Sequence, residues 1–230
     1  GGIIKSPRPP LIKGVKLLII ALAVSSFVVA TAASAHQPRY VRDNQLVLIK
    51  NPAVSQAFYG ELKGQEADYL IDLKQAQDLY FQILVPDLPG IKKDKAVTVE
   101  YAPELGAEAV NFAKLDPNSA PWINFYEEFA GDNYWQGPEI KKPAEPGYYF
   151  IKVSSPDNSG KYVLVVGEKE EFPVMEAVKA MIIIPQLKVN FFNKPVWQAF
   201  NSKIGRYFLI GLGVLVIFGF MFRKFNQVYK

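Results

Sequence analysis

The sequence predicts a mainly β chain, built as an antiparallel jelly-roll-like β-sandwich that lies between two apolar segments. Short segments rich in Val, Ile, Tyr and Phe recur along the chain, and turn residues separate them. Apolar and polar residues alternate along several of these segments, for example in residues 69–73 and 80–85. No long helical period lies between them. Many short strands at this spacing are typical of two packed antiparallel sheets.

The expected strands lie within one domain at residues 36–171. Turn sequences such as Pro-Asp-Leu-Pro-Gly at 86–90 and Ser-Pro-Asp-Asn-Ser-Gly at 155–160 separate them. A domain of this length is sufficient for one hydrophobic core. The strands are expected at residues 46–50, 56–63, 68–74, 78–85, 96–101, 109–115, 123–129, 147–154 and 161–167.

Two apolar segments, at residues 17–35 and 207–222, enclose the predicted sandwich. Basic residues precede the first segment, and Arg223 and Lys224 follow the second. Because basic residues mark the cytoplasmic side of a membrane, the sandwich is expected outside the cytoplasm, at the cell membrane. A helical juxtamembrane segment is expected at 172–203, a transmembrane helix at 204–223 and a cytoplasmic tail at 224–230.

The first apolar segment permits two interpretations. Ala33, Ser34 and Ala35 form the A-x-A pattern that signal peptidase recognises, which favours a cleaved signal peptide at 1–35 and a single-pass protein. The segment is also long enough to be an uncleaved signal anchor, which would give a two-pass protein. Both interpretations leave the sandwich outside the cytoplasm.

Composition limits the function classes. The net charge is +4, and the basic residues beside the apolar segments contribute much of it, so no nucleic-acid partner is expected. Cysteine is absent, so the domain depends on its core, on a metal or on partners rather than on disulfides.

Catalytic residues are scarce, and no enzymatic activity and no cofactor are expected. His36 is the only histidine, expected to be mobile, so a Ser-His-Asp site, a Cys-His site and a multi-histidine zinc site are excluded. The carboxylate pairs at 127–128 and 170–171 are adjacent, and adjacent residues on a strand point to opposite faces. Acidic turns at 131–133 and 156–160 offer oxygens to Ca²⁺, but ordinary turns use the same residues, and no metal site is assigned.

Aromatic residues gather in the middle of the domain. Exposed aromatic side chains there could anchor a protein partner or stack on sugar rings, whereas buried ones would belong to the core. The expected binding residues are Trp122, Phe125, Tyr126, Tyr134 and Trp135.

The pattern changes after the sandwich. Residues 174–192 can be helical, with Met175, Val178, Met181, Ile182 and Pro185 on roughly one face, and Pro185 should kink or divide the helix. Aromatic residues interleaved with lysines then favour the headgroup layer of a membrane, and an ordinary helix packed on the sandwich is the alternative. The expected membrane-interface residues are Phe191, Phe192, Lys194, Trp197, Phe200, Lys203, Arg206 and Tyr207.

Two stretches resemble the bacterial pre-peptidase C-terminal domain. Residues 58–64 (FYGELKG), followed by 68–71 (DYLI), are similar to its opening hairpin. Residues 146–153 (PGYYFIKV), followed by 159–166 (SGKYVLVV), are similar to its closing hairpin. The whole chain also resembles an uncharacterised family of signal-bearing, singly membrane-anchored prokaryotic proteins. The resemblance implies a jelly-roll sandwich that serves as a small non-catalytic accessory or binding domain.

Together these observations predict a membrane-anchored extracytoplasmic domain that binds or scaffolds without catalysis. Its expected partners are membrane lipid and another cell-envelope protein. A carbohydrate-recognition module is the first alternative, and a hydrolase that uses only carboxylates is the second.

Overall fold

The computed structural model describes residues 36–42 and 45–228. The expected signal peptide or signal anchor at 1–35 and the last two residues of the expected tail lie outside the described residues.

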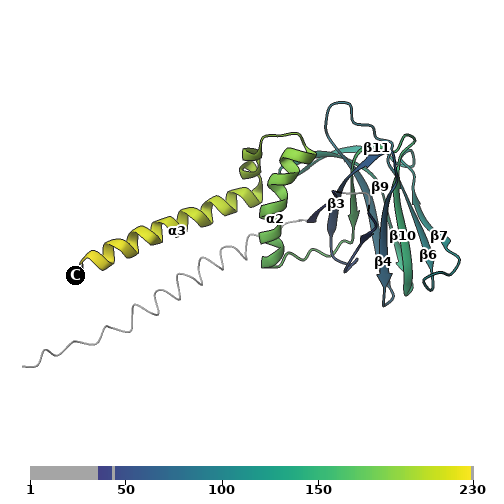
Figure 1. Cartoon of the computed structure of the whole chain (residues 1–230), viewed down its shortest axis with the longest axis horizontal. Helices are drawn as coiled ribbons and strands as arrows, with labels where there is room; N and C mark the ends of the chain where they lie inside the picture. The colour runs from purple at the N-terminus through teal and green to yellow at the C-terminus, as the bar shows by residue number, and fades with distance from the viewer. Residues whose placement is uncertain (1–35, 43–44, 229–230) are drawn as a thin grey trace, which may run out of the picture.

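Two sheets form the β-sandwich that the sequence predicts (Figure 1). The first sheet has six strands in the order β1-β3-β11-β5-β9-β8, and the second has five in the order β2-β4-β10-β6-β7. The strands are β1 (Gln37–Tyr40), β2 (Val47–Leu48), β3 (Gln56–Lys63), β4 (Ala67–Leu73), β5 (Gln77–Pro86), β6 (Ala96–Ala102), β7 (Val110–Leu115), β8 (Ile123–Glu127), β9 (Asp132–Ala144), β10 (Gly147–Ser154) and β11 (Ser159–Val166).

Most strand pairs are antiparallel, as expected, but two are parallel. β1 pairs with β3 and β2 pairs with β4 in parallel, at one edge of each sheet. Each expected strand is present; β3 and β10 have the expected ends, and the ends of the others differ from the expectation. Two further strands, β1 and the long β9, were not expected, so the prediction of the strand set was incomplete.

The main core lies between the two sheets. Alternation along the strands supplies it: in β4, Ala67, Tyr69, Ile71 and Leu73 are buried while the residues between them are more exposed. At its centre the hydroxyl groups of Tyr69 and Tyr162 share a 2.7 Å hydrogen bond, so neither buried hydroxyl is left without a partner. Each fully buried Ile, Leu or Phe side chain contributes about 1.5–3 kcal/mol to folding.

The C-terminal third of the described chain is helical. It consists of α2 (Val174–Gln186), the π-helical turn η1 (Leu187–Phe191), the 3-10 helix η2 (Val196–Asn201) and α3 (Lys203–Val228). η1 packs on the outer face of the six-stranded sheet, where Leu187, Phe191 and Phe192 meet Tyr59 and Tyr134 in a second core cluster. This segment therefore covers one face of the sandwich.

Pro185 changes the helix as the sequence predicts. It has no N–H to donate to a carbonyl one turn earlier, which disfavours the regular α-helical ladder at this point. α2 ends at Gln186 and continues as the π turn, closed by a 2.9 Å hydrogen bond from the Phe192 N–H to the Leu187 carbonyl. The wider turn places Phe191 and Phe192 together against the sheet.

The face of α2 that packs inward differs from the expected apolar face. Ala177, Ala180 and Ile184 are buried, whereas Met175 and Ile182 are exposed. The small alanine side chains let the helix backbone approach its neighbours closely, and the bulkier expected face points outward.

α3 leads away from the sandwich (Figure 1). It includes residues 204–223, where the sequence predicts the spanning helix. Among the residues that the structure describes, no helix combines the length and the apolar character needed to cross a membrane.

Candidate functional site

The five aromatic residues of the middle region do not form one surface. Phe125 and Tyr134 are cross-strand partners on the outer face of the six-stranded sheet, beneath the helical segment. Tyr134 is only 2% exposed, and its hydroxyl shares a 3.2 Å hydrogen bond with the Tyr59 hydroxyl. Tyr134 therefore belongs to the core and presents no exposed surface to a partner.

The two tryptophans are held by their surroundings. Trp122 donates its indole N–H to the Pro117 carbonyl at 2.9 Å and lies so close over Gly137 that a Cβ there would come within 2.6 Å of its ring. Trp135 donates to Asp87 at 3.0 Å, and the Lys93 ammonium lies 3.1 Å from its ring centroid. These contacts hold both indole rings in place, and both side chains are only partly buried.

Tyr126 is exposed, and so is Ile123, which is not among the expected binding residues. Tyr126 is 53% exposed and Ile123 is 61% exposed, both on β8. β8 pairs only with β9 and is the last strand of its sheet, so its other edge presents backbone N–H and C=O groups without a strand partner.

β8 differs from the other edge strands in what protects it. Natural edge strands are usually blocked by proline, by charge or by being short. β1 contains Pro38 and Arg39, β7 contains Lys114, and β2 has only two residues. In β8 the only ionisable carboxylate or basic group is Glu127, which is buried. Among the edge strands of the described sheets, β8 is therefore the one suited to accept another strand.

A buried ion cluster lies at the C-terminal end of β8. Lys188 of η1 and Asp132 of β9 are each 1% exposed, and their charged groups are 2.6 Å apart. Lys194 reaches the other oxygen of Asp132 at 2.8 Å, and Lys188 also donates to the Gly131 carbonyl at 3.1 Å. The cluster fixes the helical segment to the turn between β8 and β9.

Glu127 adjoins this cluster as the cross-strand partner of Asp132. Its carboxylate accepts the backbone N–H groups of Phe129 and Ala130, each at 2.7 Å. Burial raises the pKa of Glu127 to about 7, the two N–H donors and Lys188 oppose this rise, and Asp132 adds to it.

The two neighbouring carboxylates bear on the hydrolase alternative. A raised pKa beside a second carboxylate is a feature of acid–base sites. Here, however, Glu127 is 9% exposed and Asp132 is 1% exposed, and Asp132 is bonded to two lysines. A substrate therefore cannot reach these two carboxylates in this arrangement. The geometry suits a structural role, in which they hold the helical segment on the sandwich.

The acidic turns are occupied by protein contacts. Both oxygens of Asp132 pair with lysines, and Asp157 pairs with Lys92 at 2.6 Å, which lowers the pKa of Asp157. Asp157 also accepts the Ser159 backbone N–H at 3.2 Å within its own turn. Within the described ranges, no group of three or more His, Cys, Asp or Glu residues could hold a metal ion.

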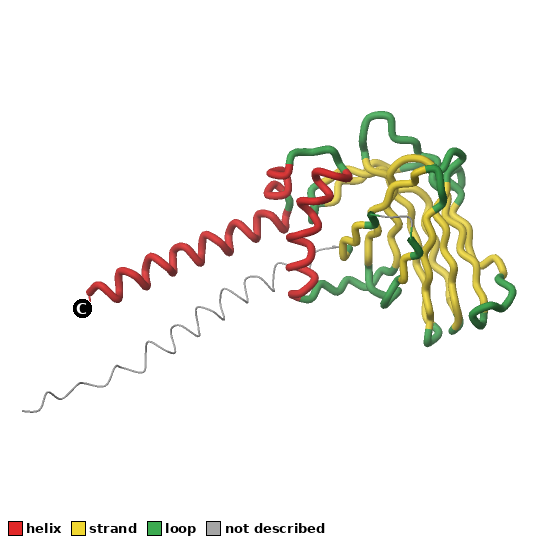
Figure 2. The backbone as a smooth tube through the Cα atoms, viewed as in Figure 1, coloured by secondary structure: helices red, strands yellow, loops and turns green. Residues whose placement is uncertain are grey.

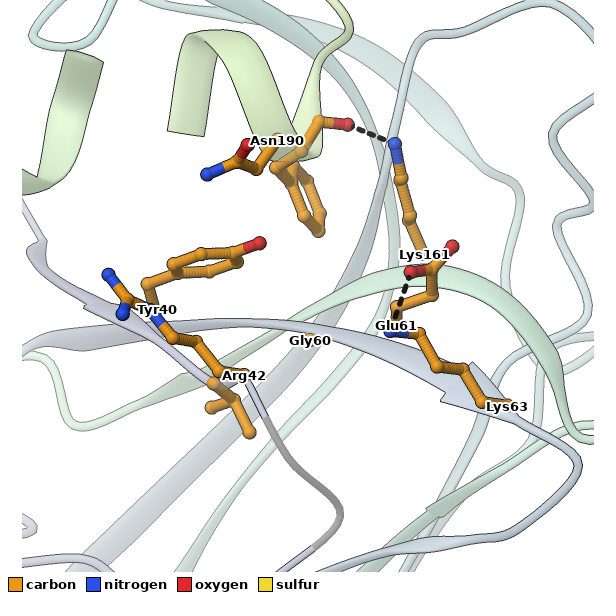
Figure 3. A pocket seen from close by; sticks show the side chains of 9 residues that line it. Tyr40, Arg42, Gly60, Glu61, Lys63, Lys161 and Asn190 are labelled. Carbon is orange, nitrogen blue, oxygen red and sulfur yellow. Dashed lines mark hydrogen bonds and ion pairs between the residues drawn. The ribbon is translucent and has the colours of Figure 1, made fainter. Parts of the chain in front are cut away.

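A small depression lies between β1, β3, β11 and η1 (Figure 3). Tyr40, Arg42, Glu61 and Lys161 are among the residues that line it. Lys161 donates to the Phe191 carbonyl at 2.5 Å, and burial lowers the pKa of Lys161. The free volume is about 20 Å³, room for about one water molecule, which is too little for an organic substrate.

The expected membrane-interface residues fall into three groups: two are buried, two pair with carboxylates, and the others are exposed wholly or in part. Phe191 and Phe192 are 1% and 2% exposed and pack on Tyr59, so the sandwich and not the surface holds these two rings. Lys194 and Lys203 bind Asp132 and Glu128. Those that face outward are Trp197 at 57% exposure, Phe200 at 42%, Arg206, and in part Tyr207.

His36 is not free, contrary to expectation. Its Nδ1 lies 2.5 Å from the Ser55 hydroxyl, and the backbone of the next residue, Gln37, donates to the Ser55 carbonyl at 2.9 Å. Burial lowers the pKa of His36 below its ordinary value, although Glu170 opposes the change. These contacts dock His36 on the sandwich beside β1.

Comparisons with known proteins add little to this description. No protein-family model and no curated protein matches the chain. One similar solved structure is the pre-peptidase C-terminal domain of collagenase from Bacillus anthracis, with 16% identity and a TM-score of 0.35 over 55% of this chain and 97% of that one. Another is CorA, a surface-associated copper-binding protein important in copper acquisition by Methylomicrobium album BG8, with 10% identity and a TM-score of 0.29 over 54% and 98% of the two chains. At these TM-scores neither likeness carries an argument about function.

Proposed function

We propose that the chain is a non-catalytic binding or scaffolding domain that lies outside the cytoplasm, is held at a membrane by α3, and docks to another cell-envelope protein through the edge of β8. The observation that carries the docking proposal is the unprotected edge of β8, with Ile123 and Tyr126 exposed beside it. A partner strand would bond to the free backbone groups, and these two side chains would fix its register.

The membrane part of the proposal rests on the side chains of α3. Phe208, Ile210, Leu212, Val216 and Phe220 are among its exposed apolar residues, with exposures from 38% to 71%. Each such side chain gains about 1.5–3 kcal/mol when it leaves water, so a helix that carries many of them needs a cover. α3 projects away from its own domain, so the sandwich does not bury these side chains, and we propose that lipid does. The basic residues that flank the apolar segments support a location of the sandwich on the extracytoplasmic side.

Photo-crosslinking in intact cells tests the docking proposal. A photoreactive phenylalanine analogue replaces Tyr126 in the full chain, and the matched control carries it at Val110, which is 57% exposed on the edge strand β7. We expect a discrete adduct with one envelope protein from position 126 and none from position 110. The analogue at position 126 also carries an affinity tag that a membrane-impermeant reagent reaches only from outside the cell. Labelling of this tag in the same cells reports on which side of the membrane position 126 lies.

A charged substitution on the edge strand β8 tests whether the adduct depends on strand pairing. Ile123→Lys places a charge on the edge strand, as natural edge strands do to resist pairing, and should abolish the adduct formed at position 126. Val110→Lys, the matched change on β7, should leave the adduct unchanged. An adduct that survives Ile123→Lys, or that forms equally from position 110, contradicts docking at β8.

A further inference from the structure

The outward face of α2 is apolar and has no cover within the described chain. Met175 is 64% exposed, Val178 is 44% and Ile182 is 59%. Their spacing of three and four residues places them on one side of the helix. Lys179 is the only basic residue of α2, and its single acidic residue, Glu176, is buried.

Charge supports an anionic lipid surface as the cover for this face. Glu176 pairs with Arg39 at 2.7 Å on the inner side, so the outer face presents no carboxylate of α2. Lys179 is exposed, although it also reaches Glu176 at 2.7 Å. An apolar helix face bordered by a lysine and free of acidic groups is typical of helices that lie in the headgroup layer.

The position of α2 relative to α3 is fixed by packing. Ala180 and Ile184 of α2 share a buried cluster with Phe129, with Ala199 of η2 and with Ile204 of α3. Met181 packs against the same cluster. This one cluster joins α2, η2 and the start of α3 to the turn after β8. The packing therefore fixes the outer face of α2 relative to the direction in which α3 projects.

Figure 2 shows the consequence. α2 lies between the strands and α3 and runs across the base of α3. The face of α2 that is turned away from the sandwich therefore points to the side toward which α3 projects. A lipid layer that covers α3 would meet this face at its boundary. Trp197, 57% exposed in η2 beside the start of α3, has the amphipathic ring that prefers the same depth.

We propose that the outer face of α2, with Met175, Val178 and Ile182, lies in the headgroup layer of the membrane that covers α3. This inference rests on the proposed membrane contact of α3 and extends it. The sandwich then has a fixed orientation, with its helical layer against the lipid and the strands away from it. A tether of α3 alone would leave the domain free to tilt.

Lipid-attached quenchers test the orientation on the full chain. The chain has no cysteine, so single cysteines carry an environment-sensitive fluorophore without background labelling. The test position is Ile182→Cys on α2, Ile210→Cys on α3 reports lipid contact of α3, and Lys114→Cys on β7 is the exposed control. The labelled chains are reconstituted into phosphatidylcholine–phosphatidylglycerol vesicles that contain lipids with a nitroxide near the headgroup. Far-UV circular dichroism confirms that each labelled chain is folded.

We expect quenching at position 182 several-fold above that at position 114, with a blue-shifted emission. Quenching at 210 together with an unquenched, solvent-exposed fluorophore at 182 overturns the orientation of α2 and leaves the membrane contact of α3 intact. Absence of quenching at 210 overturns the membrane contact of α3, and the inference about α2 falls with it.

Discussion

At the scale of single residues, the contact between Lys188 and Asp132 is the strongest constraint on the helical segment. Both side chains are 1% exposed, and removing one partner leaves a buried charge without full compensation. No sequence pattern signalled this pair, because Lys188 lies in a segment that the sequence predicts only to be helical, and Asp132 lies in a Gly-Asp-Asn sequence typical of turns. Burial that arises only from tertiary packing gives no local signal.

Lys188→Met should therefore destabilise the full chain by about 3 kcal/mol, the lower end for a broken buried pair, because Lys194 still neutralises part of the Asp132 charge. Chemical denaturation in detergent, followed by circular dichroism, measures the change. The matched control is Lys74→Met. Lys74 also lies 2.6 Å from a carboxylate, that of Asp72, but is 76% exposed, and its loss should not shift the midpoint. Equal effects of the two substitutions would contradict the role assigned to the cluster.

Glu127 should make stability depend on pH. Its pKa in the folded chain is about 7, above the ordinary value of 4.5, so the folded state binds more protons than the unfolded state between these values. Stability from this group is present at low pH and is lost as pH rises toward 7 and above. The difference between pH 4 and pH 8 is about 3 kcal/mol.

Glu127→Gln removes this titration. The denaturation free energy of the variant should change less between acidic and neutral pH than that of the unsubstituted chain, by about the same 3 kcal/mol. Glu128→Gln is the matched control, because Glu128 is 64% exposed on its side chain and adjacent in sequence. An unchanged pH profile for Glu127→Gln would show that another group causes the dependence.

At the scale of elements, the sequence predicted strands well where apolar and polar residues alternate. It predicted them poorly where a strand contains prolines or turn residues that are rare in sheets. β3 and β10 have the predicted ends. β9 was missed because Pro138 and Pro143 and the turn-like start at Asp132 argue against a strand. β9 pairs on both sides, and its partner β5 adapts to it with a register shift between Gln82 and Leu84. Such adaptation depends on the neighbouring strand and cannot be read locally.

The apolar face of α2 shows a different limit. Its sequence contains apolar residues on every side of the helix, so periodicity alone selects several faces. The buried side is the one on which Ala177 and Ala180 permit close approach, and Glu176 on that side finds Arg39. The choice depends on partners from β1, a strand that the sequence analysis did not expect.

The junction between η2 and α3 requires a glycine. A Cβ at Gly205 would lie 2.1 Å from the Ala199 carbonyl oxygen and 2.6 Å from the Phe200 Cα. Both are backbone atoms, which cannot move aside as a side chain can. Gly205→Ala should therefore separate η2 from α3 and increase proteolysis between residues 194 and 206 in the detergent-solubilised full chain.

The matched control for this change is Gly213→Ala, about two turns further along α3, where a Cβ would meet nothing within 4 Å. It should leave the cleavage pattern unchanged. Identical patterns for the two variants would show that the junction does not depend on close backbone contact.

At the scale of the whole molecule, the protein consists of a sandwich, a helical layer packed on one face, and an apolar helix that projects from this layer. The sequence predicted the sandwich and the change to helix after residue 171. Of the candidate binding residues it located Tyr126 correctly on the surface but not Tyr134, because aromatic residues serve the core and the surface with the same local pattern. The edge character of β8 depends on strand order, which the sequence does not show.

Co-flotation of the full chain with anionic lipid vesicles tests the central claim, that lipid covers the exposed apolar side chains of α3. The unsubstituted chain should float with the vesicles. Leu212→Asp/Val216→Asp, which charges two exposed positions of α3, should remain in the dense fraction, because each carboxylate costs about 2.5–3.5 kcal/mol in the apolar layer. Leu105→Asp/Val110→Asp, at somewhat more exposed positions of the sandwich, should float like the unsubstituted chain. An unsubstituted chain that stays in the dense fraction, or an α3 variant that floats as well as the control, would contradict the account.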